Sequence, residues 1–265
     1  MALDLDAYCE RIQWLGGTSP TLETLAGLMR AHMAAIPFEN LDVLLRRPVR
    51  LDVDSLQAKL VGARRGGYCF EHASLFAAAL EAIGFQPARC AGRVVLFAPR
   101  TDVPRDHMFL TVPVGDVTYV VDPGFGPFAP PGPVPLVEGR QDGATHWMER
   151  DGSLWALHVS RGADAPAMGW VSTMEPENAV DFEVSNHYIA THTASPFMNW
   201  IMMSAVTPEG RVNVMNRDVT ILTGAESRSV TLADRTALRG LLLEHFGFDL
   251  PEVETVMVPA VPEWG

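Results

Sequence analysis

A cysteine at the start of a predicted helix is the strongest candidate for chemistry in this chain. Cys69 follows the pair Gly66-Gly67, and from there apolar residues recur every three or four positions until Gly84. Gly84 suits the left-handed conformation that ends a helix. Cys69 is therefore predicted in the first turn, where free N–H groups and the helix dipole favour the thiolate, the nucleophilic form of cysteine. The alternative is a small apolar residue packed beneath a helix start, which is the commoner fate of a lone cysteine.

A nucleophilic cysteine needs a base, usually a histidine that is itself held by an acceptor. Among eight histidines, His107 is the best placed because it opens an apolar run that ends at Val114. Gly115-Asp116 then has the composition of a two-residue hairpin turn, so that Val114 faces Val117. In that register Asp122 becomes a diagonal neighbour of His107 on the same sheet face, roughly 7–8 Å away between backbones. A register slip of one residue would place the two side chains on opposite faces.

The residues after Asp122 also suggest a functional loop. Pro123 holds Asp122 extended and ends the strand. Gly124 and Gly126 would let the backbone approach a ligand closely. The alternative is an ordinary glycine-rich turn.

The composition limits the possible functions. The chain has 265 residues, enough for one large domain or two to three small ones, and its net charge of −12 argues against nucleic-acid and anionic-membrane surfaces. The three cysteines are widely spaced, which favours a reducing compartment over a disulfide framework. Neither a Cys-x-x-Cys nor a His-Glu-x-x-His motif is present, so we expect no metal site. Without a signal-peptide pattern or an 18-residue apolar run, the expected location is the cytoplasm.

The apolar periodicity and the glycine and proline content of the sequence change twice along the chain. Residues 1–84 have helical periodicity, and residues 85–190 contain short β-rich runs punctuated by glycine and proline, which indicates an antiparallel sheet. Residues 191–265 are mixed. This last part contains two strand candidates, at 200–206 and 218–222, and a predicted helix at 232–246.

Around Cys69, His107 and Asp122 the chain resembles the arylamine N-acetyltransferase family. The motifs that carry the resemblance are Arg65-Gly66-Gly67-Tyr68-Cys69, a histidine opening a strand at His107, and Asp122-Pro123-Gly124-Phe125-Gly126, flanked by the segments 36–40 (IPFEN) and 182–197. Two positions depart from the family pattern. Pro123 stands where a small aliphatic residue is commoner, and Ala73 stands where asparagine is expected.

The resemblance implies an α+β fold with an N-terminal helical bundle, a central antiparallel β-barrel and a C-terminal α/β lid around a cysteine-protease-like catalytic core. It also implies ping-pong transfer of an acetyl group from acetyl-CoA to an arylamine or arylhydrazine. In that mechanism Cys69 would be the acetylated nucleophile, His107 the base and acid, and Asp122 the residue that orients the histidine. A homodimer is a further possibility.

The resemblance also implies roles for residues around this triad. Phe38, Phe125 and Phe197 would line the acceptor pocket, and Glu39 and Arg65 would form a structural ion pair near the active site. The backbone N–H groups of Gly124 and Gly126 would contact the CoA phosphates.

Other functions fit the same residues. An amide synthase that closes a polyketide chain into a macrolactam uses the same triad. A hydrolase or a transglutaminase-like enzyme would use the same thiol without CoA. A binding protein with a disused pocket is the non-enzymatic alternative, and it is disfavoured because all three triad residue types are present.

Overall fold

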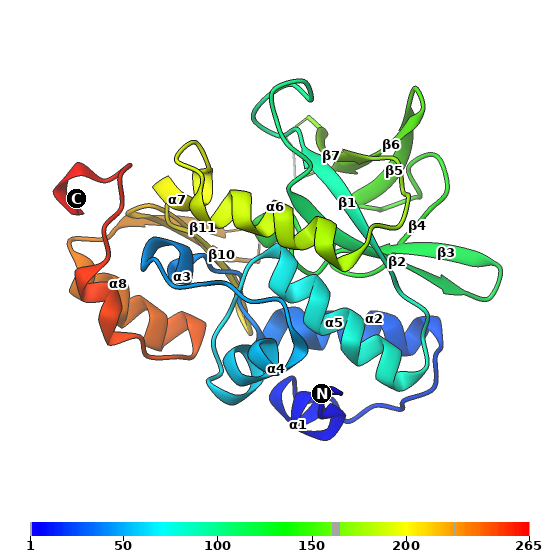
Figure 1. The fold of residues 1–265 in the computed structure, drawn as a ribbon, viewed down its shortest axis with the longest axis horizontal. Coiled ribbons are helices and arrows are strands. Elements are labelled where there is room, and N and C mark those ends of the chain that lie inside the picture. Colours follow the sequence, from blue (N-terminus) through cyan, green and yellow to red (C-terminus); the bar gives the residue numbers. More distant parts are fainter. Residues whose placement is uncertain (1, 161–164, 225, 265) are drawn as a thin grey trace.

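The computed structural model describes residues 2–160, 165–224 and 226–264. The N-terminal part of the molecule is helical (Figure 1). The helices here are α1 (Leu5–Arg11), α2 (Leu22–Ala35), α3 (Leu41–Leu44), α4 (Val53–Leu56), which continues as a π-helical segment at Gln57–Gly62, and α5 (Cys69–Ile83). Asp4, Thr21 and Asp52 cap α1, α2 and α4 by accepting a backbone N–H with their side chains.

Helix α5 lies at the centre of this part and is almost wholly buried. It begins at Cys69, where the side chain of Glu71 accepts the N–H of Tyr68 at 3.1 Å and caps the first turn. It ends at Gly84, whose φ of 106° is left-handed, as the sequence predicts.

The central part is a seven-stranded sheet with the order β4-β3-β2-β1-β7-β6-β5, and its neighbouring strands are antiparallel. The strands are β1 (Ala88–Val94), β2 (His107–Val114), β3 (Val117–Val121), β4 (Val134–Pro135), β5 (His146–Asp151), β6 (Leu154–Val159) and β7 (Ala167–Ser172). A hydrogen bond of 2.9 Å from the Gly139 N–H to the Met148 carbonyl joins the two ends, so that the sheet nearly closes into a barrel.

One segment expected to be β-rich is a helix. Residues Ala179–Thr191 form α6, whose first turn is capped by a hydrogen bond of 3.1 Å from the Asn178 N–H to Asp181. Only Phe182, Asn186 and Ile189 are buried on this helix. Val180, Val184 and Tyr188 are apolar but exposed, so apolar residues are not confined to one face of α6 and its apolar pattern is weak. The barrel strands end at Ser172 instead of reaching 190.

The C-terminal part is a four-stranded antiparallel meander followed by a helix. The strands are β8 (Met202–Thr207), β9 (Gly210–Met215), β10 (Asp218–Thr223) and β11 (Glu226–Thr231), and the short helix α7 (Pro196–Asn199) precedes them. Helix α8 (Arg235–Leu241) begins after its cap Asp234 and continues as a π-helical segment to Phe246, where the left-handed Gly247 ends it. The two strands and the helix predicted in this part are therefore present.

Two hydrophobic cores hold the molecule together. The first is shared by the N-terminal helices and the barrel, and the second lies between the C-terminal sheet, α8 and the chain end. The loop after α2 connects the two regions, because Phe38 exchanges two backbone hydrogen bonds of 2.8 and 2.9 Å with Ser204 of β8. This loop therefore pairs with the C-terminal sheet beside the start of α5.

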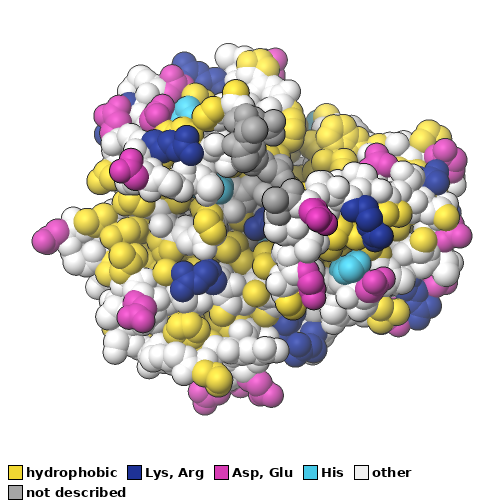
Figure 2. All heavy atoms as spheres, turned by 180° about the vertical axis from the view of Figure 1, so that it is seen from behind, with side chains coloured by type: hydrophobic (Ala, Val, Ile, Leu, Met, Phe, Trp, Pro, Cys, Tyr) yellow, Lys and Arg dark blue, Asp and Glu magenta, His cyan; other side chains and the backbone are white. Residues whose placement is uncertain are grey.

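The surface is hollowed where the barrel meets the C-terminal part, and hydrophobic side chains gather there on the face turned away from Figure 1 (Figure 2). Within the described ranges, no helix combines the length and the apolar character needed to cross a membrane.

Candidate active site

The candidate nucleophile, Cys69, is the first residue of α5 and is buried. Its sulfur lies 3.8 Å from the carbonyl oxygen of Asp106, the residue before β2. The helix start therefore sits directly against the edge of the barrel that carries His107.

The hairpin register that the sequence predicts is present. Val114 faces Val117 across a turn in which Gly115 has a φ of 60°. His107 and Asp122 consequently lie on the same side, and the His107 Nε2 donates to Asp122 Oδ2 at 2.7 Å. Because Nε2 is occupied by the carboxylate, Nδ1 is the ring nitrogen left for the Cys69 sulfur.

Asp122 makes His107 a strong base. Burial alone would lower the pKa of His107, but the charge and hydrogen bonding of Asp122 and Cys69 together outweigh burial. Together they raise the pKa of His107 from 6.5 to about 10. The imidazole is therefore protonated at neutral pH, as a thiolate–imidazolium pair requires.

Trp170 is a member of this cluster that the sequence did not reveal. Its indole Nε1 donates to Asp122 Oδ2 at 3.0 Å, and its ring stacks on Phe109 with centroids 4.1 Å apart. Asp122 Oδ1 is buried and has no hydrogen-bond partner within the described ranges. Trp170 is on β7, which meets the hairpin only because β7 pairs with β1, and no local pattern in the sequence indicates that pairing.

The three phenylalanines predicted for the acceptor pocket lie around the cluster on three different elements. The ring of Phe125 is 4.8 Å from that of His107 between centroids. Phe38 and Phe197 are half-buried and lie against each other, with centroids 6.3 Å apart. Phe197 also contacts Tyr68 at 5.2 Å, so these rings border the start of α5 from the side of the C-terminal sheet.

The two glycines of the loop after Asp122 permit close packing. A Cβ on Gly124 would lie 2.7 Å from the Cys69 Cα, so the loop presses directly on the helix start. Gly126 has a φ of 56° and packs under Phe38. This packing accounts for both glycines, and their contact with CoA phosphates stays a prediction. Pro123 does not displace Asp122 from His107.

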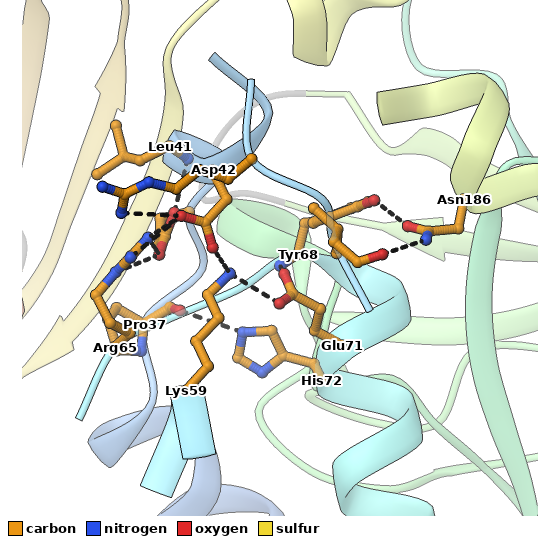
Figure 3. Close-up of polar contacts among 12 residues, drawn as sticks. Pro37, Leu41, Asp42, Lys59, Arg65, Tyr68, Glu71, His72 and Asn186 are labelled. Carbon is orange, nitrogen blue, oxygen red and sulfur yellow. Dashed lines mark hydrogen bonds and ion pairs between the residues drawn. The ribbon is translucent and has the colours of Figure 1, made fainter. Parts of the chain in front are cut away.

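A buried ionic network lies on the other side of α5 (Figure 3). Arg65 pairs with Glu39 at 2.6 Å, as expected, and also with Asp42 at 3.2 Å. Lys59 bridges Asp42 at 2.7 Å and Glu71 at 2.8 Å. Burial raises the pKa of Glu71 to about 7, although Lys59 opposes this shift. The network ties the Arg65 loop to the residue that caps α5. Its members Asp42, Lys59 and Glu71 were not predicted because each has an unremarkable local sequence.

His72 is engaged at both ring nitrogens. It faces the carbonyl oxygen of Pro37 at 3.2 Å, which requires Nε2 to donate, and Nδ1 then accepts from His32 at 2.9 Å. His32 in turn accepts from the Tyr8 hydroxyl at 2.8 Å. Burial lowers the pKa of His72 to about 4, so this chain of rings is neutral and supports the Pro37 loop.

The described residues contain no group of three or more His, Cys, Asp or Glu side chains arranged to hold a metal ion.

Comparison with known proteins shows the class of protein to which this chain belongs. A family model for N-acetyltransferases matches residues 21–255. The chain belongs to the arylamine N-acetyltransferase family: it is 36% identical to the arylamine N-acetyltransferase of Mycobacterium tuberculosis over 263 residues, covering 96% of this chain and 92% of that protein. It is 32% identical to the Escherichia coli arylamine N-acetyltransferase, covering 94% of this chain and 90% of the relative.

Solved structures of the family have the same fold. The M. tuberculosis structure superposes with a TM-score of 0.89 at 34% identity, covering 94% of this chain and 96% of the other. The Mycobacterium marinum enzyme in complex with CoA gives 0.88 at 33% identity, covering 94% of each chain.

Proposed function

We propose that this protein transfers an acetyl group from acetyl-CoA to an aromatic amine or hydrazine by a ping-pong mechanism with an acetyl-Cys69 intermediate. The observation that carries the proposal is a buried cysteine in the first turn of α5, beside an imidazole that Asp122 keeps protonated. Family membership supports the same substrates, since the M. tuberculosis and E. coli relatives are arylamine N-acetyltransferases and the M. marinum structure contains CoA.

In the first half-reaction the Cys69 thiolate attacks the acetyl carbonyl carbon of acetyl-CoA. An S–C bond forms and the carbonyl oxygen becomes an oxyanion. The backbone N–H of Cys69, in the first turn of the helix, has no intrahelical acceptor and is our candidate oxyanion donor, worth about 3 kcal/mol if typical. The bond to the CoA sulfur then breaks, and His107 gives its proton to that sulfur, which leaves as the thiol.

In the second half-reaction His107 is neutral and acts as a base. The amine nitrogen attacks the acetyl-cysteine, His107 accepts a proton from the nitrogen, and the C–S bond breaks to restore the thiolate–imidazolium pair. An arylamine suits this step because its nitrogen is unprotonated at neutral pH. Its ring would pack against Phe38, Phe125 and Phe197.

The geometry resembles the arrangement of thiol proteases in one respect. Asp122 holds one ring nitrogen of His107, which leaves the other for the sulfur. We therefore propose a cysteine-protease-like core, with the C-terminal sheet and α8 as the lid over the acceptor side. All three cysteines are free, which suits a reducing compartment, and we propose the cytoplasm.

The decisive test is a mass measurement after mixing the protein with acetyl-CoA. We expect a gain of about 42 daltons on Cys69, which an arylamine removes. Cys69→Ala should gain nothing, whereas the matched control Cys9→Ala should be acetylated like the native protein. Acetylation of the Cys69→Ala variant would disprove the assignment.

The same experiment separates the alternatives. An acetyl-enzyme that arylamines and arylhydrazines leave intact would favour an amide synthase. No acetyl-enzyme at all would favour a hydrolase, a transglutaminase-like enzyme or a binding protein.

A further inference from the structure

A groove outside the catalytic cluster lies between the segment that follows α3 and helix α6, which are side by side in Figure 1. Its cavity of about 700 Å³ is lined by residues 46–52 on one wall and by α6 residues on the other. None of Cys69, His107 and Asp122 lines it. This volume lies within the range of about 300–1,000 Å³ that is usual for small-molecule sites.

The first wall of the groove carries an unusual concentration of positive charge. Three arginines fall within five residues in a chain whose net charge is −12. Arg47 is paired with Glu252 at 2.7 Å. The guanidinium of Arg46 donates to the Met198 sulfur at 3.0 Å, and the charge of Arg50 acts on the neighbouring Asp52 carboxylate. Both guanidinium groups are exposed, so an anion in the groove could reach them.

The remaining lining residues are of a different kind. Asp52 and Glu183 are exposed carboxylates on opposite walls, and His187 lies beside Glu183 on α6. Carboxylates repel a simple anion but accept hydrogen bonds from sugar hydroxyls or amino groups. Guanidinium groups bind phosphate through two parallel hydrogen bonds. A molecule with phosphate at one end and hydroxyl or amino groups at the other matches both sets of residues.

Asn186 separates this groove from the start of α5. Its side chain donates to the Val49 carbonyl at 2.9 Å and accepts from the Tyr68 hydroxyl (Figure 3). A ligand in the groove would thus be separated from Cys69 by the hydrogen-bonded residues Val49, Asn186 and Tyr68. Tyr68 immediately precedes Cys69, so the same wall connects the groove to the nucleophile loop.

We propose that this groove is a second ligand site, separate from the catalytic cluster, for a phosphate-bearing small molecule of the nucleotide class. Arg46 and Arg50 hold the phosphate, and Asp52 and Glu183 accept hydrogen bonds from the sugar or base. The proposal does not depend on acetyl transfer, because it concerns binding at residues that the reaction does not use.

The test is calorimetric titration with ADP, carried out on the native protein and on Cys69→Ala without CoA. CoA itself contains an adenine nucleotide and would compete for the groove, so substitutions in the groove are used to locate the binding. We expect ADP to bind both proteins equally. Arg46→Gln and Arg50→Gln should each weaken binding about 10- to 100-fold, the usual effect of losing a hydrogen bond to a charged group. The matched control is Arg30→Gln on α2, an exposed arginine outside the groove, which should leave ADP binding unchanged.

Two further ligands test the chemical class. Pyrophosphate should bind more weakly than ADP, and adenosine more weakly still. Pyrophosphate binding as tightly as ADP would overturn the nucleotide class. Absence of ADP binding at millimolar concentration, or binding to both groove variants as tight as to the native protein, would each overturn the site.

Discussion

The hydrogen bond from Trp170 to Asp122 gives the sharpest test of how the proposed catalytic residues Cys69, His107 and Asp122 are held in place. Asp122 Oδ2 accepts from both His107 at 2.7 Å and Trp170 at 3.0 Å, while Oδ1 has no partner within the described ranges. Trp170→Phe keeps an aromatic ring against Phe109 but removes the indole donor. The carboxylate then keeps only its hydrogen bond from His107. Its orientation is no longer fixed by two donors.

The size of the effect follows from that bond. A hydrogen bond to a charged group contributes about 1.5–3 kcal/mol, and each 1.4 kcal/mol corresponds to about a tenfold change. If the loss is expressed in the transition state, acetylation of Cys69 slows about 10- to 100-fold. The KM for acetyl-CoA should change little, because Trp170 is buried and touches the carboxylate, not the substrate.

The assay is single-turnover acetylation of Cys69 followed by mass spectrometry, with thermal unfolding to show that the variant is folded at the assay temperature. Trp155→Phe is the matched control, since Trp155 is a half-buried barrel tryptophan stacked on Arg150 at 4.0 Å. It should acetylate at the native rate. A folded Trp170→Phe variant with a native rate constant would refute the reasoning that Trp170 positions Asp122.

Three further predictions concern stability. Lys59→Met leaves two buried carboxylates without their shared cation and should lower the free energy of unfolding by about 3–5 kcal/mol in urea titrations, while Lys59→Arg should recover part of the loss. Because the pKa of His107 is raised from 6.5 to about 10, its stabilising contribution is complete below pH 6.5 and disappears as the pH rises toward 10. The unfolding free energy of His107→Gln should therefore depend less on pH across that window, and equal slopes would contradict the shift. Gly124→Ala places a Cβ 2.7 Å from the Cys69 Cα, so it should lower the unfolding free energy by about 1–3 kcal/mol and slow acetylation, whereas Gly132→Ala, at a position with open space, should do neither.

The sequence was most informative where the physical signal is local. The spacing of apolar residues and the glycine at position 84 located the helix that begins at Cys69. The two-residue turn at 115–116 set the hairpin register, and that register alone brought His107 and Asp122 together. Helix α6 was missed because its exposed face also carries apolar residues, Val180, Val184 and Tyr188, which weakens its apolar period.

What the sequence by itself determined is therefore the set of motifs, their local conformations and, through resemblance, the family. What only the tertiary structure decided is which distant residues reach those motifs. Trp170 meets Asp122 because β7 pairs with β1, and Lys59 meets Glu71 because the segment before Arg65 folds under α5. The groove at Arg46 and Arg50 exists because α6 lies beside residues 46–52. The physical reason is range: turns and helix periods are fixed by residues a few positions apart, whereas these contacts depend on how whole elements pack.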